Sequence, residues 1–289
     1  MTHEQETKDT SAAPSHPTDA QGKPAAPGGQ GKPRQHDKVT RMGTESIPRL
    51  ITEFAIPSIL GMLVNGAYNV IDSIFLGQAM GEIGLSTATV AMPIMTVFMA
   101  IAMLVGNGGN ALAALRMGEG KPEEAERSLG NTVTLSLIAS VVVAVVMFVP
   151  ACIDGLLSVS GATPEDWDYA MQFIRIISLG FIFQCIGMGV NNFIRTAGAP
   201  NRALGTMIIG AVACTAFNAL FVLVMGMGVV GSALATVCGQ AISCATVLWY
   251  FCLTKGVPMR LRLRMMPLHG ETVRLILSLG LASFAVQAG

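Results

Sequence analysis

The chain has 289 residues, of which 52% are hydrophobic and only 12% are charged, and its mean hydropathy is +0.57. Soluble domains are about a quarter charged, so this composition excludes an ordinary soluble protein and indicates one that lies in a membrane. The 18 basic residues balance 18 acidic ones and are spread over several connections, so no nucleic-acid partner is expected.

Residues 1–46 are rich in Pro, Gly, Ser, Thr, Gln and Lys and contain no apolar run. Because such a segment cannot bury enough apolar surface to fold, we expect it to be a disordered cytosolic tail. No basic segment followed by an apolar core and a small-residue cleavage site precedes the first long apolar run, so we expect no removable signal peptide.

Six apolar stretches follow, each long enough to cross the ~30 Å hydrocarbon core of a bilayer as a helix of about 20 residues. A seventh begins near Thr272 and is cut short at Gly289. We therefore predict an all-α integral membrane protein with a tail over 1–46, a six-helix lobe over 47–256, and an inter-lobe connection with a truncated seventh helix over 257–289. The predicted spans are 50–76, 88–115, 131–153, 169–194, 204–225 and 230–253.

The Lys and Arg residues set the expected orientation of these spans. Apart from Arg175, they lie before the first span or in every second connection, whereas the connections at 77–87, 154–168 and 226–229 contain none. Cytosolic connections carry the excess of Lys and Arg, so we expect the N-terminus to lie in the cytosol.

Asp72 needs an explanation, because it lies near the end of the first span with a long apolar run before it. A charge at bilayer depth costs roughly 2.5–3.5 kcal/mol on insertion scales, so it persists only with a partner, a cavity or a function. Asp72 ends a polar stripe with the spacing i, i+3, i+4, i+7, which we expect to face the bundle interior. The other members of the stripe are Asn65, Tyr68 and Asn69.

The stripe suits a site for a monovalent cation or a proton. A carboxylate surrounded by amide, hydroxyl and backbone oxygens can bind a hard cation, and the same carboxylate, once desolvated, can carry a proton. Either event removes a buried charge and lets the helix repack. Pro57 cannot donate the usual backbone hydrogen bond and gives the helix a place to bend. We therefore predict Asp72 as a coupling carboxylate and Pro57 as a hinge.

A structural role for Asp72 also stays open. Arg175 is the only basic residue inside a predicted span, and both residues would lie in the half of the bilayer away from the N-terminus. The two could form an ion pair that leaves no proton site, or Arg175 could extend to the interface. The 18 Met residues leave a similar choice, since they could line a cavity for flat organic cations or simply fill the core.

Smaller features indicate structure rather than chemistry. The glycine-rich run 106–110 offers small surfaces for close helix packing. Glu165, Asp166 and Asp168 are expected to form a solvated rim, and the six cysteines show no metal-binding spacing. No nucleophile cluster, metal cluster or phosphate loop is present, so neither an enzyme nor a cofactor is expected.

An internal repeat links the first span to the start of the seventh. Both helices would enter the membrane from the same side. Repeated lobes around a central site are common in secondary transporters, so the repeat fits a second six-helix lobe that begins near residue 270. The matching residues, at a constant offset of 225, are Arg49, Leu50, Ile51 and Ser58 with Arg274, Leu275, Ile276 and Ser283.

Four segments, in order along the chain, resemble one known family. In the first, Pro57 is followed by Asp72 within the sequence Tyr-Asn-Val-Ile-Asp-Ser, and the others lie at 108–125, 193–200 and 226–236. Together they are similar to the N-terminal lobe of the multidrug and toxic compound extrusion (MATE) transporters. The resemblance implies that this chain is the first lobe of a two-lobe, twelve-helix transporter.

The resemblance also implies a polar cluster around Asp72. In many prokaryotic members the fifth helix carries an Asn and, one turn later, an Asp, but the corresponding residues here are Cys214 and Asn218. Thr236 matches a hydroxyl residue of the family's sixth helix, and Tyr68 matches an aromatic neighbour of the aspartate. The second carboxylate is thus absent, which leaves the coupling ion open between proton and sodium.

The implied function is ion-coupled antiport that exports small organic cations across the inner membrane of a bacterial cell. The expected partners are these cations, the lipid bilayer and a missing C-terminal lobe. Two alternatives stay open. One is a flippase for lipid-linked precursors, which would need a large cationic cavity, and the other is a membrane fragment that transports nothing because it lacks the second lobe.

Overall fold

The computed structural model describes residues 47–254, 257 and 259–288, so the predicted tail over 1–46 lies outside it. All described residues belong to one compact unit. Within this part of the chain all regular elements are helices and there is no strand, which confirms the all-α prediction. The boundary predicted at 256–257 stays a prediction.

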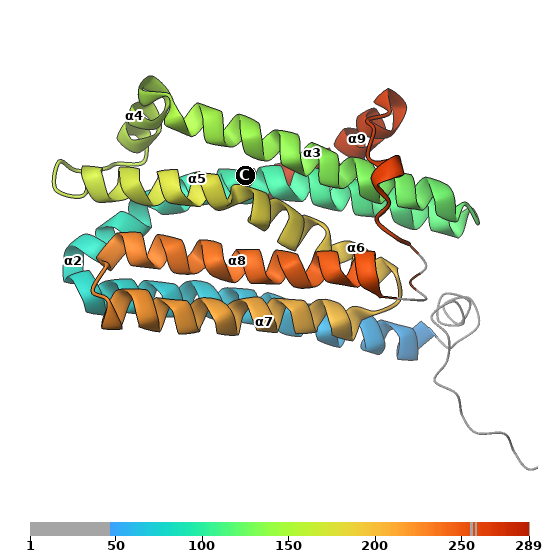
Figure 1. Ribbon diagram of the computed structural model, residues 1–289, viewed down its shortest axis with the longest axis horizontal. Helices are drawn as coiled ribbons and strands as arrows, with labels where there is room; N and C mark the ends of the chain where they lie inside the picture. Colours follow the sequence, from blue (N-terminus) through green and yellow to red (C-terminus); the bar gives the residue numbers. More distant parts are fainter. Residues whose placement is uncertain (1–46, 255–256, 258, 289) are drawn as a thin grey trace, which may run out of the picture. The chain divides into compact units, whose positions relative to one another are not determined.

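The helices follow one another with short connections (Figure 1). Three of them begin with proline, at Pro122, Pro150 and Pro200, where the fixed φ suits the first helical position and the missing N–H costs nothing. The elements are α2 (Ile47–Gly118), α3 (Pro122–Phe148), α4 (Pro150–Val159), α5 (Trp167–Gly189), α6 (Asn191–Thr196), α7 (Pro200–Asn218), the π-helix η1 (Ala219–Val224), α8 (Gly228–Leu253), the short η2 (Leu263–Met265) and α9 (Gly270–Ala288).

Five helices of the described chain are long and apolar enough to cross a membrane. They correspond to the second through sixth predicted spans, with α5 and α6 counted as one span and η1 continuing α7. The first predicted span, 50–76, is helical throughout, although several of its side chains lie outside the description. The five are Met80–Gly118, Pro122–Phe148, Trp167–Thr196, Pro200–Val224 and Gly228–Leu253.

The connection expected at 77–87 is wrong, because α2 runs through it with a single break. Gly81 has φ 60° and ψ −133°, a backbone conformation that side-chain-bearing residues rarely adopt. One glycine therefore joins the first two spans and replaces a loop. Pro57 and Pro93 both lie inside α2, and neither interrupts its helical dihedral angles.

The third predicted span, 131–153, also differs from the structure. α3 begins nine residues earlier, at Pro122, and ends at Phe148. Val149 then adopts an extended backbone, which is the conformation favoured before a proline, and Pro150 starts the short helix α4.

The glycine-rich run of α2 packs closely against three neighbours, as expected for small residues. A side chain at Gly106 would collide with the backbone of Gly189 in α5, and one at Gly109 would collide with Thr132 in α3. Gly108 lies against the carbonyl of Ile276 in α9. α2 is therefore the helix on which α3, α5 and α9 converge.

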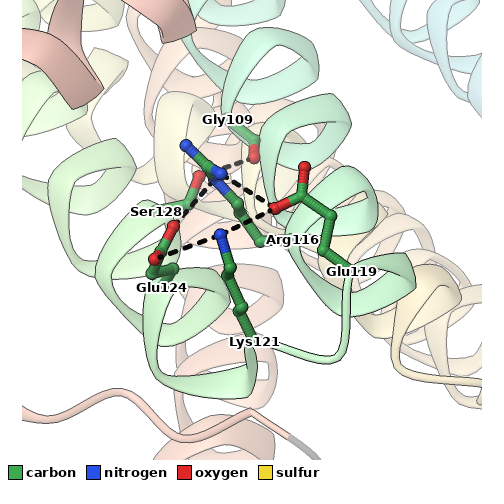
Figure 2. A network of polar contacts seen from close by, with 6 residues as sticks. All are labelled: Gly109, Arg116, Glu119, Lys121, Glu124 and Ser128. Atoms are coloured by element: carbon green, nitrogen blue, oxygen red, sulfur yellow. Dashed lines mark hydrogen bonds and ion pairs between the residues drawn. The ribbon is translucent and has the colours of Figure 1, made fainter.

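A charged network closes the turn between α2 and α3 (Figure 2). Arg116 Nη1 lies 2.9 Å from Glu119 Oε2, and Arg116 Nε lies 3.0 Å from Glu124 Oε2. Lys121 Nζ lies 3.3 Å from Glu119 Oε2. The hydrogen bond from Arg116 holds the pKa of Glu119 below its ordinary value. One turn further in, Ser128 Oγ donates to the carbonyl of Gly109 at 2.8 Å, so the network continues into the packed interface of the two helices.

Candidate functional site

Asp72 is held by two neutral side chains from two other helices. Asn218 Nδ2, at the end of α7, donates to Asp72 Oδ1 at 2.9 Å, and Ser232 Oγ, in α8, donates to the same oxygen at 2.9 Å. Asn218 and Ser232 are buried, with exposed fractions of 1% and 0%. The first span is thereby joined to the fifth and sixth through a single carboxylate oxygen.

Two oxygens on the helices that hold this carboxylate are buried without a hydrogen-bond partner. One is Asn218 Oδ1, whose amide nitrogen holds Asp72, and the other is Thr236 Oγ1, one turn along α8 from Ser232. An unpaired buried polar group costs about 1–3 kcal/mol, so such groups persist where they serve a ligand or a change of state. The cluster therefore offers carboxylate, amide and hydroxyl oxygens of the kind that hard cations prefer.

The backbone of α7 changes just past Asn218. Residues Ala219–Val224 form a π-helix, and the N–H of Met225 donates to the carbonyl of Leu220 at 2.9 Å. π-Helical turns are rare and occur frequently at functional sites, because the extra residue shifts every later side chain around the helix axis. Cys214, one turn before Asn218, is buried, and its Sγ lies 3.4 Å from Asn218 Nδ2.

The structure brings together only part of the predicted site. Asp72 and Asn218 are in contact, Cys214 touches Asn218, and Thr236 lies one turn from Ser232. The side chains of Asn65, Tyr68 and Asn69 lie outside the described residues. Pro57 is buried within α2, and its role as a hinge stays a prediction.

Ser232 was not predicted from the sequence as a residue of the site. Its spacing of four from Thr236 places both hydroxyls on one face of α8, and this pattern was the available signal. A serine inside an apolar helix is otherwise common, and it commonly bonds to the carbonyl four residues back. The spacing alone therefore could not distinguish Ser232 from other serines in the spans.

Arg175 does not neutralise Asp72. The guanidinium of Arg175 instead lies over the ring of Phe148, 5.9 Å from its centroid, and no ion pair joins the two residues in the described structure. Arg175 Nε is buried without a hydrogen-bond partner. The ion-pair alternative for Asp72 therefore finds no support in this geometry.

The expected solvated rim is wrong at one residue. Asp166 is 1% exposed and accepts hydrogen bonds from Ser86 Oγ, from Thr163 N at 2.7 Å and from Thr163 Oγ1 at 3.0 Å. Burial alone would raise the pKa of Asp166, but these hydrogen bonds outweigh it and hold the pKa below its ordinary value. Asp166 thus ties the α4–α5 turn to α2, whereas Glu165 and Asp168 are exposed.

Comparison with known proteins places the chain among transporters. The MatE family model matches residues 57–220. The chain is 24% identical over 210 residues to the multidrug export protein MepA of Staphylococcus haemolyticus, covering 71% of this chain and 45% of that protein. It is 25% identical over 232 residues to the probable multidrug resistance protein YpnP of Bacillus subtilis, covering 79% and 50%. The chain thus spans about half the length of these curated relatives.

Solved structures agree with this likeness. The MATE multidrug transporter DinF-BH is 34% identical with a TM-score of 0.79, covering 85% of this chain and 55% of that one. An outward-facing conformation of a multidrug resistance MATE family transporter is 27% identical with a TM-score of 0.75, covering 82% and 52%. Together with the apolar helices, these matches identify a multi-pass, all-α membrane protein.

Proposed function

The chain belongs to the MATE family of transporters, whose model matches more than half of it, and from this premise we propose that it forms the first lobe of an ion-coupled exporter of small organic cations. Asp72 is the coupling carboxylate in this proposal. The observation that carries it is the pair of hydrogen bonds from Asn218 and Ser232 to one oxygen of Asp72, beside two buried oxygens without partners.

The contacts suggest how a cation would act on the lobe. An arriving proton or sodium ion neutralises Asp72, so the hydrogen bonds from Asn218 and Ser232 lose the charge that strengthens them. A sodium ion would also attract Asn218 Oδ1 and Thr236 Oγ1, which have no other partner. Since Asp72 joins α2 to α7 and α8, its neutralisation loosens one helix against the other two.

Export also needs a second lobe and an orientation. We place the N-terminus in the cytosol and the chain in the bacterial inner membrane, because the basic residues follow the positive-inside pattern. Alternating access would come from movement of this lobe against a second one. Solved relatives described as outward-facing and inward-facing MATE family transporters support such a pair of states.

The test is efflux of a cationic dye from cells that express the full transporter containing this chain. Asp72→Asn keeps the shape of the side chain but cannot take up the ion, so we expect efflux to fall to the level of cells without the protein. Asp168→Asn is the matched control, because it removes an exposed carboxylate. Wild-type efflux by Asp72→Asn at equal expression would exclude the coupling role.

The alternative of an inert fragment has its own measurement. Cells that express only these 289 residues should show no dye efflux if a second lobe is required. Efflux by this chain alone would contradict the two-lobe arrangement and would point to a smaller transporting unit.

A further inference from the structure

A cavity of about 460 Å³ lies between the first turns of α5 and the turn that joins η1 to α8. Its lining residues include Met80 of α2, Tyr169 and Gln172 of α5, Val222 of η1, and Val229 and Val230 of α8. One water molecule occupies about 30 Å³ of liquid, so the cavity has room for a chain of waters or for a hydrated ion. No residue described so far as part of the Asp72 site lines it.

The cavity nevertheless lies next to the Asp72 site along two helices. Val222 lies one turn beyond Asn218, and Val229 precedes Ser232 by three residues. Ser232 lies four positions after Gly228 in α8, a rise of about 6 Å. Val222 and Val229 line the cavity and are 2% and 1% exposed, and each lies within about one turn, along its own helix, of a donor that holds Asp72.

The walls of the cavity lie on segments that can change shape. Val222 belongs to the π-helix η1, in which a shift to ordinary α-helical hydrogen bonding would turn the valine around the helix axis. Met80 precedes Gly81, the break in α2, and it packs against Gly228, where an added side-chain carbon would lie 2.7 Å from Met80 Sδ. Gly228 itself has φ 55°, so the close approach of Met80 depends on a glycine at this turn.

We propose that this cavity is the access vestibule through which the coupling cation reaches Asp72 from the side of the membrane opposite the N-terminus. Its occupant is a hydrated monovalent cation or the water chain that carries a proton. Val222 and Val229 close its floor, and the π-helix η1 opens it. The inference rests on the coupling role proposed for Asp72, because only that role requires an ion to arrive there.

Thiol labelling of the full chain in sealed, right-side-out vesicles tests the vestibule without requiring transport. The six native cysteines are replaced by alanine, and Val230→Cys is introduced into the cavity wall. Gln172→Cys, which lines the cavity from α5, is a second variant at an exposed position outside the core. Each is treated from outside with cationic and anionic methanethiosulfonates of equal size. Val159→Cys, at an exposed position near the end of α4, is the control.

We expect the cationic reagent to modify Val230→Cys faster than the anionic one by at least about tenfold, because a carboxylate beneath the cavity concentrates cations. Adding Asp72→Asn should bring that ratio close to the ratio at Val159→Cys. Failure of both cavity cysteines to react while Val159→Cys reacts would overturn the vestibule. An unchanged ratio in the Asp72→Asn background would also overturn it, since the selectivity would then come from exposed acids such as Asp168.

The two proposals can fail separately. Loss of dye efflux in Asp72→Asn without labelling of the cavity would leave the coupling role intact and remove the vestibule. Selective labelling that depends on Asp72, together with normal efflux in Asp72→Asn, would show a path to a carboxylate that does not couple transport. The vestibule would then not serve a coupling ion, and the proposal as stated would be wrong.

Discussion

Glu126 of α3 holds the backbone of Arg260, in the connection that leads to α9. Glu126 Oε1 accepts the N–H of Arg260 at 3.0 Å, and Glu126 Oε2 lies 3.2 Å from Arg262 Nε. The carboxylate is buried, whereas the Arg262 side chain is 59% exposed, so the ion pair adds little and the backbone hydrogen bond matters more. Further along, Thr134 Oγ1 donates to the carbonyl of Met266 at 2.9 Å.

Glu126→Ala should release this connection from α3. We expect the free energy of unfolding to fall by about 1–2 kcal/mol, because the N–H of Arg260 loses its acceptor. Trypsin should then cleave faster at Arg260, Arg262 and Arg264 than in the unchanged protein. Glu123→Ala is the control, since Glu123 is an exposed residue of the same helix. Equal cleavage rates in both variants would show that Glu126 does not hold the connection.

Ser232→Ala should weaken cation binding at Asp72 without unfolding the lobe. The substitution removes one of two donors to Asp72 Oδ1 and one oxygen that could face a sodium ion. A hydrogen bond of this kind contributes about 1 kcal/mol, which corresponds to roughly a fivefold loss of affinity. The measurement is the sodium concentration that protects Asp72 from modification by a hydrophobic carbodiimide.

Ser243→Ala is the matched control for this measurement. Ser243 lies on the same helix, and its hydroxyl donates to the carbonyl of Thr206 at 3.4 Å, away from Asp72. Equal protection in Ser232→Ala and Ser243→Ala would show that the hydroxyl beside Asp72 takes no part in binding. Carbodiimide modification that sodium never affects would instead indicate that Asp72 carries a proton.

Gly280→Ala should disturb the contact of α9 with α2. A side-chain carbon at Gly280 would collide with the backbone carbonyl of Leu104, which cannot move as a flexible side chain can. Overpacking of this type costs about 1–3 kcal/mol, so we expect a lower melting temperature. Gly270→Ala, on the same helix, has open space around its added carbon and should leave stability unchanged or slightly higher. Similar melting temperatures for the two variants would contradict the close packing.

The helices could be predicted from the sequence because membrane spans have a strong compositional signal. Hydropathy located the second through sixth spans, and α8 begins only two residues before its predicted start. The ends of helices that are set by backbone geometry were harder to predict from the sequence. Gly81 replaces a loop with a single positive φ, and nothing in the surrounding sequence distinguishes such a glycine from one that only allows close packing.

The residues of the candidate site could be predicted where helical spacing or the family resemblance indicated them. They could not be predicted where the packing of the helices determines which side chains meet. Asp72 stood out because a charge within an apolar run needs a reason. Asn218 came from the family resemblance alone, since one asparagine at the end of α7 forms no helical pattern of its own. Asp166 was expected in solvent because its neighbours Glu165 and Asp168 are charged, yet the turn that it caps buries it. A run of charged residues predicts that the segment as a whole is exposed. Whether one of its carboxylates is buried depends on which N–H and O–H groups of the folded turn need an acceptor.

Asp166→Asn should destabilise the α4–α5 turn at neutral pH and should remove the part of the loss of stability in acid that comes from protonation of Asp166. The hydrogen bonds from Ser86 and Thr163 hold the pKa of Asp166 below its value in the unfolded chain, which is about 3.9. A carboxylate with a lowered pKa stabilises the folded state above that unfolded value and loses this contribution as the pH falls through the folded pKa. The unchanged protein should therefore lose stability below about pH 4 through this residue.

Melting temperature measured against pH distinguishes Asp166 from its neighbour. Asp166→Asn should melt lower than the unchanged protein at pH 7, and the difference should shrink as the pH falls, because protonation of Asp166 removes the same charge. Glu165→Gln is the control, because Glu165 is exposed at the same turn and should leave the pH dependence unaltered. If the melting temperatures of the two variants depended on pH in the same way, the buried carboxylate would not stabilise the turn. The apolar contacts of α4 and α5 would then hold the turn in place instead.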